Sequence, residues 1–188
     1  MKHGAVRALA RAMHGRVNGR EGDQGTDTIA VSGGAGRGQR HPRRGLVAHP
    51  APALIYNPSP SVPRGFYVRA HEPVAVGDFV TLRAADASPA YAQARDFTDR
   101  TDRFIKRVAA VGGTLVCAEG DRVTVPGRAP MARLAQDSAG RVLPSWDGCR
   151  TLGADEVFLL GDTADSFDSR YWGPVHMTAI NGVWRPLF

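Results

Sequence analysis

The stretch RFIKRVAAV, residues 103–111, reads as a β-strand and contains the most unusual residue of the folded part of the chain. The run is rich in residues that favour strands, and a pair of glycines follows it directly. Because side chains alternate along a strand, Phe104, Lys106 and Val108 share one face, while the flanking arginines point to the other. Lys106 is therefore predicted to lie between two apolar neighbours.

Lysine is rare in this sequence. Of its 24 basic residues only Lys2 and Lys106 are lysines, and the other 22 are arginines. A buried lysine can lose its proton near neutral pH, whereas arginine effectively cannot. Desolvation lowers the pKa of a lysine and makes its amine a usable base. The position favours Lys106 as a general base; the alternative is a chance lysine in an arginine-biased chain.

The sequence around this strand predicts a mainly β domain with antiparallel strands and irregular connections. Short runs of strand-forming residues are separated by turn residues, and a weak helical pattern covers 88–100. A hairpin is expected within 114–127, with its turn at Glu119-Gly120-Asp121. The other predicted strands are residues 66–70, 78–84, 156–162 and 179–187.

The length of 188 residues fits one domain with a tail. Residues 1–45 hold nine basic and three acidic side chains, which account for the whole net charge of +6. This segment is rich in Gly and Arg and poor in apolar residues, so disorder is expected there. Residues 46–188 hold fifteen side chains of each sign. The basic charge therefore belongs to the tail and not to a nucleic-acid-binding face of the folded domain.

Several functional classes lack a signal. No stretch of about 18 apolar residues predicts a membrane span, and no apolar central region predicts a signal peptide. The six histidines are scattered, and Cys117 and Cys149 lack the spacing of a metal motif, so neither a metal nor another cofactor is expected. The two cysteines could close one disulfide or remain free thiols.

Two further segments carry candidate site residues. In NPSPSVPRGFY, residues 57–67, Ser59 and Ser61 flank a proline, and two more prolines stiffen the segment. Such a rigid loop suits a nucleophilic hydroxyl, although a proline-rich linker would have the same composition. In LLGDTADSFDSRYWGPV, residues 159–175, the side chain of Ser166 could hydrogen-bond an amine, and an Asp-Ser-Arg run could pair to fix the loop.

In this order, the three segments resemble the type I signal peptidases, which are serine–lysine membrane peptidases. The form NPSPSVPRGFY is most similar to the TraF-type peptidases of conjugative transfer systems. The resemblance covers about residues 54–188 and implies a signal-peptidase or LexA-like antiparallel β fold. By this resemblance, Ser61 matches the nucleophile and Lys106 the general base. Ser59 matches the residue whose hydroxyl, with the Ser61 backbone N–H, forms the oxyanion hole.

The resemblance also assigns supporting roles. Ser166 matches the serine that orients the lysine amine, and Asp168 with Arg170 matches a structural ion pair behind the site. The short region between the lysine strand and residue 161 implies an accessory domain reduced to a hairpin cap. Because the family works in an oxidising compartment, a Cys117–Cys149 disulfide is expected, and it would tie this cap to the catalytic sheet.

The resemblance implies a serine endopeptidase that processes exported precursor proteins, with a conjugative pilin precursor as the expected substrate and either hydrolysis or cyclisation as the outcome. It implies work at the periplasmic face of the inner membrane, near the membrane surface, with no specific nucleic acid as a partner. A LexA-like self-cleaving regulator is an alternative, although residues 1–45 do not read as a helix-turn-helix. An inactive or nucleic-acid-binding member led by its basic tail is the other alternative.

Overall fold

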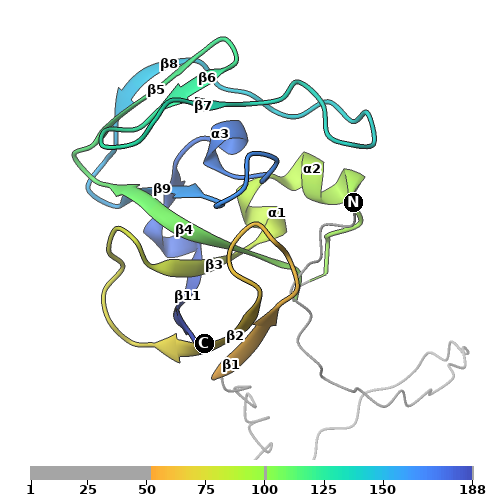
Figure 1. Ribbon diagram of the computed structural model, residues 1–188, viewed down its shortest axis with the longest axis vertical. Helices are drawn as coiled ribbons and strands as arrows, with labels where there is room; N and C mark the ends of the chain where they lie inside the picture. The colour runs from red at the N-terminus through yellow and green to blue at the C-terminus, as the bar shows by residue number, and fades with distance from the viewer. Residues whose placement is uncertain (1–51, 100, 188) are drawn as a thin grey trace, which may run out of the picture. The chain divides into compact units, whose positions relative to one another are not determined.

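The computed structural model describes residues 52–99 and 101–187, which are built around two antiparallel β-sheets (Figure 1). The segment 1–45, predicted to be disordered, and the predicted start of the folded domain at residue 46 lie outside the described residues. The mainly β, antiparallel fold predicted from the sequence is confirmed. The strands are β1 (Leu54–Asn57), β2 (Gly65–Ala70), β3 (Phe79–Arg83), β4 (Arg103–Val111), β5 (Leu115–Glu119), β6 (Arg122–Thr124), β7 (Met131–Ala132), β8 (Gly148–Thr151), β9 (Glu156–Leu160), β10 (Val175–His176) and β11 (Ile180–Pro186). The helices are α1 (Ala84–Ala87), α2 (Pro89–Ala94), α3 (Ser169–Trp172) and a 3₁₀ turn (Met177–Ala179).

The larger sheet has seven strands in the order β1-β2-β11-β3-β4-β9-β10. Strand β4 covers the predicted range 103–111, and β9 ends at Leu160, two residues earlier than expected. All five residues of β9 are buried: Val157 and Leu159 pack into one apolar cluster, Phe158 and Leu160 into another, and Glu156 accepts hydrogen bonds from Arg150. The sheet thus holds the lysine strand β4 between β3 and β9, in its interior.

The hairpin between β1 and β2 carries the predicted serine loop. Leu54 of β1 pairs with Val68 of β2, and Asn57 pairs with Gly65, so residues 58–64 form the connecting loop. Figure 1 shows this loop reaching from the β1–β2 end of the molecule towards the middle of the larger sheet. The loop is therefore anchored by β1 at its start and by β2 at its end.

The smaller sheet has four strands in the order β7-β6-β5-β8. Strands β5 and β6 form the hairpin predicted within 114–127, and its turn uses Gly120 at a positive φ of 57°. Strands β7 and β8 extend this hairpin, so the cap is a sheet and not a hairpin alone. Val116 and Val123 of the cap pack on Ala110 and Phe158 of the larger sheet, which forms one continuous apolar core.

A disulfide joins Cys117 of β5 to Cys149 of β8, and the two residues lie directly opposite each other in the register. The predicted pairing is therefore present. The expectation that it would tie the cap to the catalytic sheet is wrong, because β8 is itself a strand of the cap. The chain returns to the larger sheet only afterwards, at β9. The bridge instead fixes the register of the outer strand of the smaller sheet.

Protein made in an oxidising compartment is expected to release no thiol when denatured without reductant, and two thiols per chain after reduction. Closing a loop with a sequence separation of 32 residues stabilises a fold by about 3 to 4 kcal/mol in the chain-entropy model. Thiol titration and thermal unfolding with and without reductant measure both quantities. Two free thiols in the unreduced, denatured sample would contradict the bridge.

Candidate active site

The six residues singled out from the sequence are all buried, and none is more than 7% exposed; they are Ser59, Ser61, Lys106, Ser166, Asp168 and Arg170. Buried polar groups in folded proteins almost always have hydrogen-bond partners, because an unpaired group costs the free energy of its lost hydration. The partners of these six side chains therefore define the site. They come from three segments: the β1–β2 loop, strand β4, and the loop between β9 and α3.

The serine loop is organised by hydrogen bonds between its own two serines. The backbone N–H of Ser61 donates to Ser59 Oγ at 3.2 Å, and Ser59 Oγ donates to Ser61 Oγ at 3.1 Å. The Ser59 hydroxyl thus accepts one bond and donates another, as hydroxyl groups can. In this state, the two groups assigned to the oxyanion hole bond each other. A substrate oxyanion can use both donors only after the Ser59 side chain turns away from Ser61.

Lys106 lies in the interior of the larger sheet, opposite Val80 of β3. Its Nζ donates a hydrogen bond of 2.7 Å to Ser166 Oγ and lies 5.8 Å from the centre of the Phe104 ring. Burial lowers the pKa of Lys106 from 10.5 to about 8; the negative charge of Asp168 opposes this shift, and the positive charge of Arg170 adds to it. Desolvation therefore brings the amine close to neutrality at mildly basic pH.

Gly161 and Asp162 hold the serine loop close to Ser166, the hydrogen-bond partner of Lys106. The backbone N–H of Asp162 donates to the carbonyl of Ser61 at 2.6 Å. A methyl group on Gly161 would lie 2.0 Å from Ser166 Oγ and 2.9 Å from the Ser61 carbonyl oxygen. Both atoms thus approach the same bare Cα, and only glycine permits this close packing. Ser61 and Ser166 therefore border the same glycine from two different segments.

The described residues contain no direct hydrogen bond between Ser61 Oγ and Lys106 Nζ. The hydrogen bond of Nζ goes to Ser166, and that of the Ser61 hydroxyl comes from Ser59. Because Ser61 Oγ accepts in its bond with Ser59, that bond does not use the Ser61 proton, which can pass to Lys106 when Ser61 Oγ comes within hydrogen-bond distance of Nζ. Catalytic hydrogen bonds commonly tighten only when substrate is bound, so this geometry is compatible with a serine–lysine pair.

Asp168 and Arg170 form the buried ion pair that was predicted, with Nη2 and Oδ2 2.8 Å apart. Asp168 also accepts a hydrogen bond from the Gly161 N–H at 2.8 Å and caps α3 through the Arg170 N–H. The guanidinium of Arg170 donates to three carbonyl oxygens of the preceding loop, those of Thr163, Ala164 and Ser166. The pair therefore holds the loop that presents Ser166 to the lysine.

Sequence reasoning missed a second ion pair beside the site. Arg107 donates two hydrogen bonds to the carboxylate of Asp162, at 2.8 and 3.0 Å, and its guanidinium lies 4.2 Å from the centre of the Phe79 ring. Since Arg107 follows Lys106 in β4, and Asp162 bonds the Ser61 carbonyl, this pair links the lysine strand to the serine loop. In the sequence, Arg107 follows Lys106 and Asp162 follows Gly161, but no local pattern indicates that these two distant residues pair.

A cavity of about 620 Å³ lies between the cap and the loop after β9. The cap contributes Met131 and Leu134, and the loop contributes Gly161, Ala164 and Asp165.

The described residues contain no group of three or more His, Cys, Asp or Glu side chains that could hold a metal ion. In the same part of the chain, no helix is long and apolar enough to cross a membrane.

Comparisons with known proteins cover the same region. The family described as "Signal peptidase, peptidase S26" matches residues 43–188. The plasmid transfer protein TraF of Escherichia coli is 34% identical over 149 residues, which span 70% of this chain and 80% of TraF. The conjugal transfer protein TraF of Agrobacterium tumefaciens (strain 15955) is 34% identical over 143 residues, with the same coverage. A signal peptidase I from Enterococcus faecalis V583 aligns over 61% of this chain and 98% of its own, with 22% identity and a TM-score of 0.35. The family match includes all six candidate residues.

Proposed function

Because the chain belongs to the signal peptidase family, peptidase S26, we propose that it is a serine endopeptidase with Ser61 as nucleophile and Lys106 as general base. The observation that carries the proposal is the buried Lys106 amine, hydrogen-bonded to Ser166 at 2.7 Å and with its pKa lowered by burial to about 8. With a pKa of about 8, part of the Lys106 population is neutral near physiological pH, and the neutral amine is the form that can accept a proton from a serine hydroxyl.

The reaction follows from these groups. Neutral Lys106 takes the proton of Ser61 Oγ as the oxygen attacks the scissile carbonyl carbon, and the carbonyl electrons move to its oxygen. The oxyanion accepts hydrogen bonds from the Ser61 backbone N–H and the Ser59 hydroxyl. When the tetrahedral intermediate collapses, the Lys106 ammonium protonates the leaving amine. An acyl-enzyme on Ser61 remains, and water or a second amine then resolves it.

Ser166 has the role of orienting the base in this proposal. Its hydroxyl oxygen accepts from Lys106 Nζ, which keeps the flexible lysine chain in one rotamer. The carbonyl of the same residue accepts from Arg170 at 3.0 Å, so the Asp168–Arg170 pair fixes Ser166 from behind. A base held in one position loses less conformational entropy when it reaches the transition state.

The substrate class is an exported precursor protein with small residues before the cut. Two of the relatives are named plasmid or conjugal transfer proteins TraF, which supports a role in conjugative transfer and makes a pilin precursor the expected substrate. If water resolves the acyl-enzyme, the product is a shortened linear chain. If the amino group of the same product chain resolves it, the product is cyclic.

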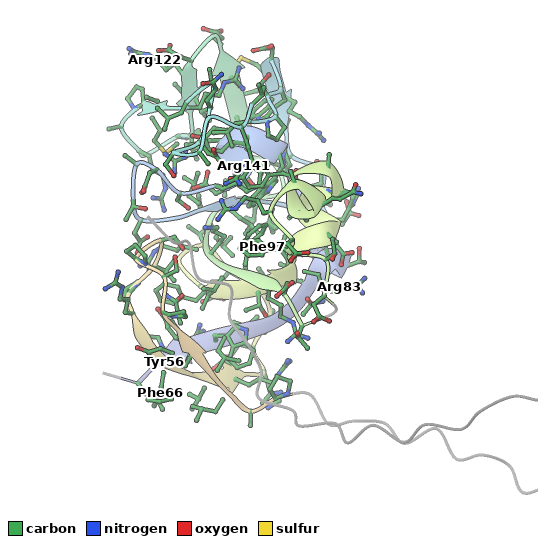
Figure 2. The ribbon with its side chains drawn as sticks, turned by 90° about the vertical axis from the view of Figure 1, so that its right-hand side faces the viewer. Tyr56, Phe66, Arg83, Phe97, Arg122 and Arg141 are labelled. Atoms are coloured by element: carbon green, nitrogen blue, oxygen red, sulfur yellow. A yellow bond between two sulfur atoms is a disulfide. The ribbon has the colours of Figure 1, made fainter. Side chains whose placement is uncertain are left out.

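The proposed place of work is the periplasmic face of the inner membrane. On the β1–β2 hairpin, Tyr56 and Phe66 lie side by side on the outer surface, with ring centres 5.0 Å apart (Figure 2). Leu54 and Leu187 are also about half exposed. Large apolar side chains gathered at one end of a protein support contact with a membrane surface. No specific nucleic acid is proposed as a partner.

The test is incubation of the purified protein with a pilin-precursor peptide that has small residues at the first and third positions before the cut. Mass spectrometry of the products is expected to show cleavage at one bond after these residues. A linear product contains the elements of one added water, and a cyclic product lacks them. No cleavage of any such precursor by folded protein would refute the proposed function.

The rate of cleavage is expected to depend on the ionisation of Lys106. Because burial lowers its pKa to about 8, activity should rise as pH increases through about 8 and reach a plateau well below 10.5. The sign follows because the protonated form, which dominates below the folded-state pKa, cannot accept the serine proton. Initial rates from pH 6 to pH 11 measure this profile. A rate that keeps climbing beyond pH 10 would mean that Lys106 is not desolvated.

A further inference from the structure

We propose that Asn57 is the positioning residue of the nucleophile, because its side chain fixes the loop that carries Ser59 and Ser61. The role rests on the proposed function of Ser61. Asn57 is the last residue of β1, and its side chain has no exposed surface. The hydrogen bonds of its buried amide go to Ser59, Val62 and Pro63 of the loop.

The side chain of Asn57 makes four hydrogen bonds to the backbone of the loop. Its Nδ2 donates to the carbonyl oxygens of Ser59 at 2.9 Å, Val62 at 3.1 Å and Pro63 at 3.0 Å. Its Oδ1 accepts from the backbone N–H of Ser59 at 3.0 Å. Since an amide has two N–H groups, at least one is shared between two carbonyls. One side chain thus bonds the residue two before Ser61 in the loop and the residue directly after it.

The composition of the loop explains why such a residue is needed. Three of its residues are prolines, which have no N–H to donate. The N–H of Ser61 is already used by Ser59 Oγ. A buried carbonyl oxygen without a donor costs the free energy of its lost hydration, so the loop requires donors from outside itself. Asn57 supplies them from the end of a strand, where the backbone is fixed by pairing with Gly65.

These bonds constrain Ser61 on both sides. The loop can shift Ser61 relative to Lys106 only by breaking the bonds to Ser59, Val62 or Pro63. A displacement of 1 Å between reacting groups costs about 100-fold in rate. Asn57 therefore contributes to catalysis through the position of Ser61, with no part in proton transfer.

Tyr67 provides an internal comparison. Its hydroxyl donates to the Pro63 carbonyl at 2.6 Å, the same oxygen that accepts from Asn57. Pro63 lies at the far end of the loop from Ser59. Removing the Tyr67 hydroxyl leaves that carbonyl with its bond from Asn57, so Tyr67→Phe is expected to reduce the rate less than any change at Asn57.

The test is Asn57→Asp, which retains the size of the side chain and its acceptor oxygen, loses the N–H donors, and brings a carboxylate against three carbonyl oxygens. The kcat is expected to fall by about 100-fold, while KM stays within about twofold of the wild-type value. Gln93→Glu is the matched control, because it is the same amide-to-carboxylate change at an exposed residue of α2 and is expected to leave both constants unchanged. If Asn57→Asp does not fold, Asn57→Ser is the second variant: its shorter hydroxyl cannot make the four bonds of the amide but adds no charge, so kcat is expected to fall, and a wild-type kcat in this variant would overturn the inference.

Amide hydrogen exchange separates this inference from the proposed function. The Ser61 amide is expected to exchange about tenfold faster in Asn57→Asp, while the amides of β4 keep their wild-type rates, because only the loop opens. Wild-type kcat and wild-type exchange in the variant would overturn the inference. Faster exchange throughout β4, or a rise in KM that accounts for the loss, would also overturn it, since the role would then be structural. If the wild-type protein cleaves no precursor, the proposed function is refuted. Independently of activity, an unchanged exchange rate of the Ser61 amide in Asn57→Asp would refute the role of Asn57 in fixing the loop.

Discussion

Replacing Ser61 with alanine, or Lys106 with arginine, is expected to reduce cleavage of a precursor peptide by about 10⁴-fold or more, while the protein stays folded. Ser61→Ala removes the oxygen that attacks the carbonyl. Lys106→Arg retains the positive charge but replaces an amine that can be neutral with a guanidinium that cannot. The two residues act as a unit, so the double variant is expected to be no slower than either single variant.

The measurement is the rate of peptide cleavage, with circular dichroism and thermal unfolding as checks on the fold. Arg83→Lys is the matched control for the basic position, because Arg83 pairs with Asp86 on the surface and lies outside the site. Its rate is expected to equal that of the wild type. A rate within tenfold of wild type in either Ser61→Ala or Lys106→Arg would exclude the serine–lysine pair as the catalytic centre.

The lysine strand could be predicted from sequence because its information is local. Alternation along 103–111 and the glycines after it define β4 with its observed bounds. The same alternation predicted that Lys106 lies among apolar neighbours, and burial is the largest cause of its lowered pKa. The ion pair of Asp168 and Arg170 was also within reach, since the two residues are two apart and close one loop.

Features that depend on distant pairing could not be predicted. All residues of β8 are exposed, so it has no apolar alternation, and it is a strand only because β5 pairs with it. The prediction that the disulfide joins the cap to the larger sheet was wrong for the same reason: the sequence does not show that Cys149 lies in a strand of the cap. Arg107 and Asp162 are 55 residues apart in the sequence and meet only in the folded sheet. Asn57 adjoins the serines in sequence, yet its four bonds depend on the turn that the loop adopts.

Replacing Gly161 with alanine is expected to lower the rate of cleavage by about 100-fold or more and to destabilise the fold by about 1 to 3 kcal/mol. The added methyl group would lie 2.0 Å from Ser166 Oγ and 2.5 Å from Ser166 Cβ, distances that real contacts do not reach. It would also lie 2.9 Å from the carbonyl oxygen of Ser61. Turning the Ser166 hydroxyl away would cost the Lys106 amine its hydrogen bond, and moving the backbone would displace the nucleophile loop.

Gly153→Ala provides the control for this change. Gly153 lies three residues before β9 and Gly161 directly after it, but the nearest atom to a methyl group added at Gly153 lies at 3.4 Å, an ordinary contact. Its cleavage rate and unfolding temperature are therefore expected to stay close to those of the wild type. Because Gly161 touches both Ser166 and the Ser61 loop, Gly161→Ala tests the contact that brings the two halves of the site together. Wild-type cleavage by a folded Gly161→Ala variant would contradict that contact, and with it the account of how Ser61 is held near the lysine.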